Sequence, residues 1–132
     1  MKFYKAQVIS LLVFIYLLFF PFIATAQGIK VTVEDIVSNP SKYDGKIVEV
    51  RGKVESLKFK ISKKGNPYTV FDLVDKGQAV RVFSFGTLPI REGDEVRVVG
   101  KYQRVKYVGP YIFYNEIDAT EGEVKKIRWK IF

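Results

Sequence analysis

The sequence predicts an all-β protein, a small closed barrel of five strands with one short helix before it. Two observations support this prediction. First, Lys46 to Phe59 alternates apolar and polar residues over an unusual length for one strand, with Gly52 in its middle. A glycine inside a strand is typical of a bulge or of a bend at a barrel corner. Second, several shorter alternating segments follow, separated by glycine- and proline-containing turns, which is typical of sandwiches and barrels.

Residues 1–26 differ in composition from the rest of the chain. Lys2 and Lys5 precede a run of about 16 apolar residues, Val8 to Ile23, which is shorter than the roughly 20 residues of a membrane span. Ala24-Thr25-Ala26 then has the small-x-small pattern of a cleavage site. These features predict a secretory signal peptide cleaved after Ala26, with an uncleaved N-terminal anchor as the alternative. In both cases we expect an exported domain that is periplasmic, extracellular or membrane-attached.

A short helix is the first regular element expected after residue 26. Thr32 to Asp35 resembles a capping box and predicts a helix over Val33–Ser38, which Asn39-Pro40 ends. Ile36 and Val37 are expected to pack onto one end of the barrel. A turn is expected over Pro40–Gly45.

The five strands follow from alternation and from the turns between them. The first two are separated by a basic loop, 60–67, and the next two by the tight turn 75–77. Residues 86–93 cross over to the fourth strand, and Val108-Gly109-Pro110 makes the last turn. The strands are predicted at 46–59, 68–74, 78–85, 95–106 and 111–118.

Residues 119–132 form a separate tail in this prediction, after a domain that spans residues 27–118. Ile127, Trp129 and Ile131 alternate with Arg128, Lys130 and Phe132, which favours an extended segment that adds a strand to the barrel. The alternative is an anchor at a membrane or protein surface, because Trp and cations are common there.

The composition excludes most kinds of catalytic site. The chain has 132 residues, enough for one domain, and a net charge of +8. It contains no Cys and no His, which removes the thiolate nucleophile, the commonest general base and the commonest metal ligand. No serine lies in a G-x-S-x-G motif. We therefore expect no catalytic residue, no metal site and no cofactor, and we expect that the protein is not an enzyme.

Three segments resemble the OB-fold nucleic-acid-binding family, and most closely its anticodon-binding type. They read VEVRGKVESL, YTVFDLVDKGQAVRVFSF and LPIREGDEVRVVGKY, and the resemblance covers about residues 31–118. It implies a five-stranded Greek-key barrel. Many such domains carry a helix between the third and fourth strands, for which 86–93 is too short. We therefore expect the N-terminal helix to close that end of the barrel.

The resemblance also implies where a ligand lies: across the second and third strands, between two loops. The loops carry lysines and arginines, and the strands carry outward aromatic residues if Val80 and Val82 face the core. This mixture suits single-stranded nucleic acid, since cations contact phosphates and rings stack on bases. The candidate binding residues are Lys60, Lys63, Lys64, Tyr68, Arg81, Phe83, Arg104, Lys106 and Tyr107.

Each candidate has a simpler structural interpretation. Lysine-rich loops are commonly just solvated. Phe83 and Phe85 would join the core if the third strand slipped by one residue, which exchanges its two faces. Tyr68 and Tyr107 would then be packing at the rim of the barrel.

The predicted function is an exported binding module for single-stranded nucleic acid or another anionic polymer. The alternative is a structural or interaction protein of the cell envelope, which binds a protein partner through a sheet edge or the tail. Membrane contact is expected only through an uncleaved N-terminus or the tail.

Overall fold

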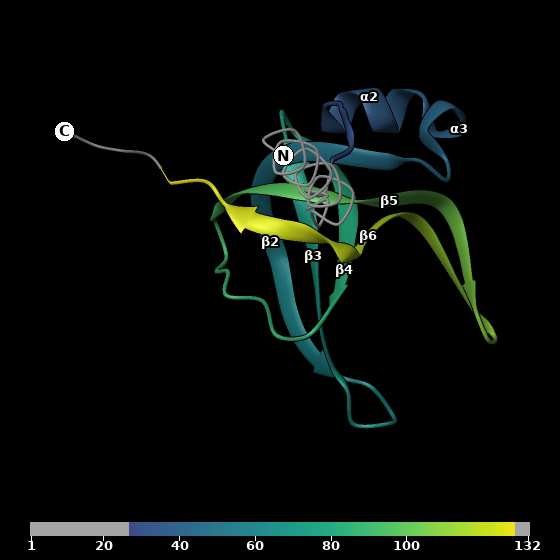
Figure 1. Cartoon of the computed structure of the whole chain (residues 1–132), viewed down its shortest axis with the longest axis vertical. Helices are drawn as coiled ribbons and strands as arrows, with labels where there is room; N and C mark the ends of the chain where they lie inside the picture. Colours follow the sequence, from purple (N-terminus) through teal and green to yellow (C-terminus); the bar gives the residue numbers. More distant parts are fainter. Residues whose placement is uncertain (1–26, 129–132) are drawn as a thin grey trace, which may run out of the picture.

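The computed structural model describes residues 27–128, and most of them lie in strands (Figure 1). The predicted segment 1–26 and the last residues of the tail lie outside this range, so the signal peptide stays a prediction. The elements in chain order are β1 (Ile29–Lys30), α2 (Val33–Ser38), α3 (Pro40–Tyr43), β2 (Ile47–Ile61), β3 (Pro67–Asp75), β4 (Gln78–Phe85), β5 (Glu95–Val108) and β6 (Tyr111–Lys126).

The strands form one closed sheet in the order β1-β2-β3-β4-β6-β5, and β2 also pairs with β5. The β4–β6 pairing is parallel and joins Arg81–Phe83 to Glu116–Asp118. The predicted five-stranded barrel with a short N-terminal helix is therefore confirmed, and the two-residue strand β1 is added to it beside β2.

Strand β2 serves both sides of the barrel, as its length and central glycine predicted. Its first half pairs with β5, its second half pairs with β3, and Lys53 has a partner in each. At Gly52 a Cβ would lie 2.8 Å from the carbonyl oxygen of Val74, so a side chain there would clash with the backbone of β3. The glycine allows the close approach of β3 at the point where β2 changes partners.

A second bend in β2, at Ser56, was not predicted from the sequence. The register between β2 and β3 shifts between Glu55 and Lys58, and Ser56 has a φ of 52°. The two backbone N–H groups of Ser56 and Leu57 donate to the carboxylate of Glu92, at 3.0 and 2.9 Å. This carboxylate satisfies donors that the bulge leaves without a strand partner.

The helix α2 caps one end of the barrel and has the predicted bounds. The N–H of Asp35 donates to Thr32 Oγ1 at 3.0 Å, and the N–H of Thr32 donates to Asp35 Oδ2 at 2.9 Å. Val33 and Ile36 are fully buried, whereas Val37 is 47% exposed. The expectation that Val37 packs onto the barrel was wrong, because residues three apart share a helix face and adjacent ones do not.

One further expectation about local structure was wrong. Residues after Asn39 form a second helical turn, α3, instead of an irregular turn. Proline suits the first position of a helix, so Pro40 ends α2 and also starts α3. Strand β6 continues through residues 119–126, which the sequence assigned to the tail, and pairs again with β5 at Val96–Val99. None of the helices among residues 27–128 is long and apolar enough to cross a membrane.

Candidate nucleic-acid interface

Two hairpins extend from the barrel like arms and flank the outer surface of β4 (Figure 1). One arm is formed by the ends of β2 and β3, and the other by the long, curved ends of β5 and β6. We call the surface between them the inter-arm face and define it by six side chains that take part in ring–ring or cation–π contacts. They are Tyr68, Arg81, Phe83, Phe85, Lys106 and Phe113.

Three aromatic rings form the centre of the inter-arm face. The Tyr68 and Phe83 rings lie 5.6 Å apart, and the Phe83 and Phe85 rings lie 5.1 Å apart, edge to face. The register of β4 places them there: Val80, Val82 and Ser84 are buried, while the residues between them face out. Phe85 is 56% exposed, so the alternative in which these rings belong to the core is excluded.

Two cations border these rings. Lys106 lies over Phe83, and Arg81 lies over a fourth ring, Phe113. The ammonium of Lys106 is 4.6 Å from the centre of the Phe83 ring, and the Arg81 guanidinium is 5.9 Å from the centre of the Phe113 ring. Both distances are within the range of cation–π attraction. The second arm therefore folds back over β4 and brings Lys106 and Phe113 onto the inter-arm face.

The cations of the inter-arm face are paired with acids that the sequence did not single out. Lys106 Nζ lies 3.0 Å from Glu116 Oε1 and 3.5 Å from Asp118 Oδ2, and Arg81 Nε lies 3.9 Å from Glu116 Oε2. Glu116 is only 3% exposed. The Arg81–Glu116 pair depends on the parallel pairing of β4 with β6, and the two Lys106 pairs depend on the register between β5 and β6. Charge alternation in the sequence predicts neither.

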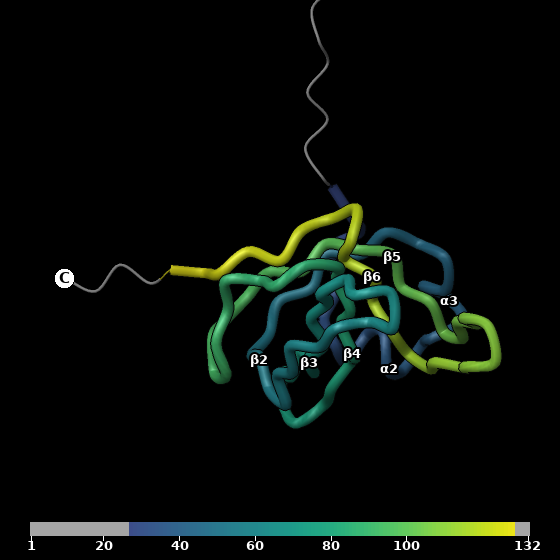
Figure 2. The backbone as a smooth tube through the Cα atoms, turned by 90° about the horizontal axis from the view of Figure 1, so that it is seen from below, coloured from purple at the N-terminus to yellow at the C-terminus, as the bar shows by residue number. Residues whose placement is uncertain are grey.

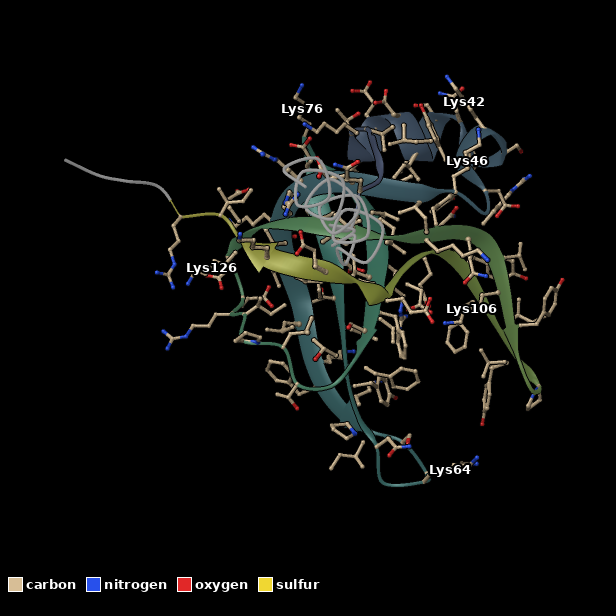
Figure 3. The ribbon with its side chains drawn as sticks, viewed as in Figure 1. Lys42, Lys46, Lys64, Lys76, Lys106 and Lys126 are labelled. Carbon is tan, nitrogen blue, oxygen red and sulfur yellow. The ribbon has the colours of Figure 1, made fainter. Side chains whose placement is uncertain are left out.

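The loop lysines lie on the other arm. Lys60, Lys63 and Lys64 are exposed, and Lys60 pairs across the strands with Tyr68. Figure 3 shows Lys64 at the far end of this arm and Lys106 on the opposite one. Among the described residues these three lysines form no ion pair within 4.0 Å. They are available to an anionic chain that leaves the inter-arm face along β2 and β3.

Arg104 and Tyr107 do not lie on the inter-arm face. Arg104 Nη1 donates to Ser41 Oγ at 3.0 Å, and the Arg104 N–H donates to Asp44 Oδ1 at 2.9 Å, so this residue fastens β5 to the α3 region. Tyr107 is 73% exposed and follows Lys106 in β5. Because neighbouring strand residues point to opposite faces, Tyr107 faces away from the rings.

The six side chains thus comprise four predicted residues and two others. The alternation of the third strand placed Phe85 outward if Val80 and Val82 face the core, whereas no pattern in the sequence pointed to Phe113. A phenylalanine in an alternating strand resembles a core residue, and only the curvature of the second arm brings Phe113 beside Arg81.

A separate hollow is lined by Gln27, Lys30, Glu49, Arg97 and Glu123 among others, and its arginine is paired with both acids. Arg97 Nη1 donates to Glu49 Oε1 at 2.8 Å, and Nη2 of the same guanidinium donates to Glu123. Arg97 therefore links β5 to β2 and β6 in the wall of the barrel. Within residues 27–128 no three acidic side chains are grouped so that they could hold a metal ion.

Comparison with known proteins shows the fold of this chain. No family model matches it, and none of the curated proteins does. The crystal structure of yeast Stn1 and Ten1 superposes with a TM-score of 0.56 at 11% identity, over 77% of this chain and 64% of that one. A putative aspartyl-tRNA synthetase from Leishmania major Friedlin gives 0.55 at 15% identity, over 95% of this chain and 27% of that one.

A third similar structure is the OB domain of Ta0387 from Thermoplasma acidophilum, at 20% identity and a TM-score of 0.49, over 77% of this chain and 90% of that one. The chain thus spans a little under two thirds of the first matched structure and about a quarter of the synthetase. The closed five-stranded topology, with the two superpositions at TM-scores of 0.56 and 0.55, establishes an OB fold, as the sequence motifs indicated.

Proposed function

We propose that this chain is a binding module that holds single-stranded nucleic acid on the inter-arm face. The observation that carries the proposal is a contiguous set of three rings on the outer surface of β3 and β4, of which Phe85 is exposed and Tyr68 and Phe83 are half-buried. This is the surface that OB folds use for oligonucleotides and oligosaccharides. The role is binding, and no residue is assigned to catalysis.

The rings favour nucleic acid over other anionic polymers. Every base has a π-face, and stacking on an aromatic side chain contributes about 1–3 kcal/mol per base. A polymer without rings would gain only the electrostatic attraction of the loop lysines, Lys60, Lys63 and Lys64. Centroid spacings of 5.1 and 5.6 Å make the rings neighbours, so two bases of one strand can occupy them in succession.

Titration of a fluorescently labelled oligothymidylate at 50 and 200 mM salt tests the proposal. We expect binding at the lower salt and weaker binding at the higher, because phosphate contacts release counterions. A labelled abasic oligomer of equal length is the control, since it keeps the phosphates and lacks the bases. No binding at 50 mM salt, or equal affinity for the two oligomers, would contradict base stacking on this face.

Export is part of the proposal. It is supported by the basic start, the apolar run and the Ala24-Thr25-Ala26 pattern before residue 27. Mass spectrometry of the protein from the cell envelope or medium of its own source is expected to show a chain that starts at Gln27. A full-length chain in the envelope would favour the anchor instead, and a full-length chain in the cytoplasm would contradict export.

A protein partner is a second candidate, and one observation favours it. The side of the second arm that faces away from the rings carries Tyr107, Ile112 and Tyr114, which are 73, 49 and 63% exposed. A group of exposed large apolar side chains is typical of a docking surface. Replacing Tyr107 and Tyr114 by serine should then abolish co-purification of a partner from the envelope and leave oligothymidylate binding unchanged. Unchanged co-purification would exclude this surface.

A further inference from the structure

Glu116 is a buried carboxylate beneath the inter-arm face. It lies on β6, opposite Arg81 of β4, and only 3% of its surface is exposed. Its two oxygens face the two cations of the face: Oε1 is 3.0 Å from Lys106 Nζ, and Oε2 is 3.9 Å from Arg81 Nε. One acid therefore restrains both.

The backbone of β6 explains how a carboxylate comes to lie there. Asn115, the preceding residue, has a φ of 50°, a conformation that asparagine tolerates better than most residues. Its side-chain oxygen accepts a hydrogen bond of 2.5 Å from the hydroxyl of Tyr102, which is fully buried. Burial raises the pKa of Tyr102, so the hydroxyl stays protonated and remains a donor. Within the β5–β6 hairpin, Gln103 pairs with Glu116 and Lys106 pairs with Phe113, so Lys106 reaches Glu116 across the same two strands.

Most sides of the Lys106 ammonium are already occupied by neighbouring groups. It has three N–H donors. One points to Glu116, a second carboxylate oxygen, from Asp118, lies 3.5 Å away, and the Phe83 ring covers another side at 4.6 Å. A phosphate that bound Lys106 would have to compete with two carboxylates and would approach their negative charges. For Arg81 the competing carboxylate is that of Glu116 alone, 3.9 Å from Arg81 Nε.

We propose that Glu116, assisted by Asp118, is a specificity-determining residue that holds Lys106 and Arg81 and excludes phosphate from the inter-arm face. This inference rests on the proposed function and defines its ligand more closely. The ligand is a single strand whose bases lie on the rings and whose phosphates contact the loop lysines. A negatively charged group of the ligand, such as a terminal phosphate, is repelled from the position above the rings by the carboxylates of Glu116 and Asp118.

The variant Glu116→Gln tests the proposal, because glutamine keeps the shape and removes the charge. The matched control is Glu34→Gln, which changes the net charge equally at an exposed position of α2, outside the inter-arm face. Heparin-affinity chromatography measures how strongly each protein holds a polyanion, whether or not nucleic acid is the ligand. We expect Glu116→Gln to elute at higher salt than both the wild type and the control.

Oligothymidylate titrations give the second readout. The slope of log K against log salt is about −0.7 for each phosphate contacted on a single strand, so releasing two cations should steepen it by up to about 1.4. A role that is only structural would lower the melting temperature without steepening the slope. Elution of Glu116→Gln together with Glu34→Gln, both folded by circular dichroism, overturns the proposal.

Two further outcomes are also decisive. If Glu116→Gln does not fold, Asp118→Asn takes its place, since Asp118 is 28% exposed and also contacts Lys106. Elution of Asp118→Asn above the Glu34→Gln control supports the proposal, and elution with that control overturns it. A gain in heparin retention without any oligothymidylate binding would support the restraint of the cations and contradict the proposed function.

Discussion

Phe83 is at the centre of the inter-arm face because three contacts meet at its ring. It touches Tyr68 and Phe85 on its own sheet, and Lys106 of the second arm lies over it. A ring held in this way presents a surface that is already ordered before a base arrives. Less rotamer entropy is then lost on binding.

Replacing Phe83 by alanine should weaken oligothymidylate binding by about 5- to 150-fold, which corresponds to 1–3 kcal/mol for one stacked base. The measurement is fluorescence anisotropy at 50 mM salt. Phe59→Ala is the matched control: Phe59 is 51% exposed on the same arm as Tyr68. It pairs with Thr69, so it faces away from Tyr68 and its loss should leave binding unchanged. Equal losses in the two variants would contradict base stacking on Phe83.

Asp35 links a single residue to the stability of α2. The Thr32 N–H donates to its carboxylate, and this bond holds the pKa of Asp35 below its usual value. A lowered folded-state pKa stabilises the fold above the unfolded value of about 3.9, and that stabilisation is lost as pH falls through the folded pKa. The melting temperature of Asp35→Asn should thus be below that of the wild type at pH 7, and the two should converge only below about pH 4. A constant difference from pH 7 to pH 2 would contradict this linkage.

At the scale of elements, β2 determines the shape of the molecule. It joins β5 to β3 by changing partners at Gly52 and bends again at Ser56, where Glu92 satisfies the free N–H groups. The second bend directs the end of β2 into the first arm. The alternating pattern and the glycine predicted the change of partners. The carboxylate from a distant loop could not be found in the same way.

Gly52→Ala should lower the free energy of unfolding by about 1–3 kcal/mol, because the added methyl meets the Val74 carbonyl at 2.8 Å and forces a shift of the backbone. Chemical denaturation followed by circular dichroism measures the loss. The exposed neighbour Lys53→Ala is the control and should change stability by less than about 0.5 kcal/mol. A Gly52→Ala variant as stable as this control would show that β3 can move away at no cost.

At the scale of the whole molecule, charge is divided between two regions. The cations over the rings are paired with acids, whereas the loop lysines of the first arm are exposed. Figure 2 shows the second arm projecting beside α3. A bound strand would therefore run from the rings towards the first arm, where the available positive charge lies.

Replacing Lys60, Lys63 and Lys64 together by glutamine should make the salt slope of oligothymidylate binding shallower by up to about 2, at 0.7 per phosphate contact. The control replaces Lys42, Lys46 and Lys76 by glutamine. These replacements change the net charge equally, at the opposite end of the molecule from Lys64 (Figure 3). The control slope should stay near that of the wild type. Equal slopes in the two triple variants would show that only the net charge matters.

The sequence by itself determined the barrel and the capped helix, and it left two alternatives for Phe83 and Phe85, of which the structure shows the outward one. These features are local, because alternation, a capping box and a central glycine express backbone geometry within a few residues. For the same reason the sequence correctly placed Tyr68, Arg81 and Phe83 on one face, and the three lysines on one loop.

Only the tertiary structure decided what surrounds those residues. The parallel pairing of β4 with β6 brings Glu116 to Arg81, the register of β5 on β6 brings it to Lys106, and the contacts of Arg104 with α3 remove Arg104 from the candidate site. The Arg81 and Arg104 contacts join residues far apart in the chain, and no local pattern records which strands become neighbours. Burial of the Glu116 charge needs both partners at once, so only the closed barrel sets the electrostatics of the inter-arm face.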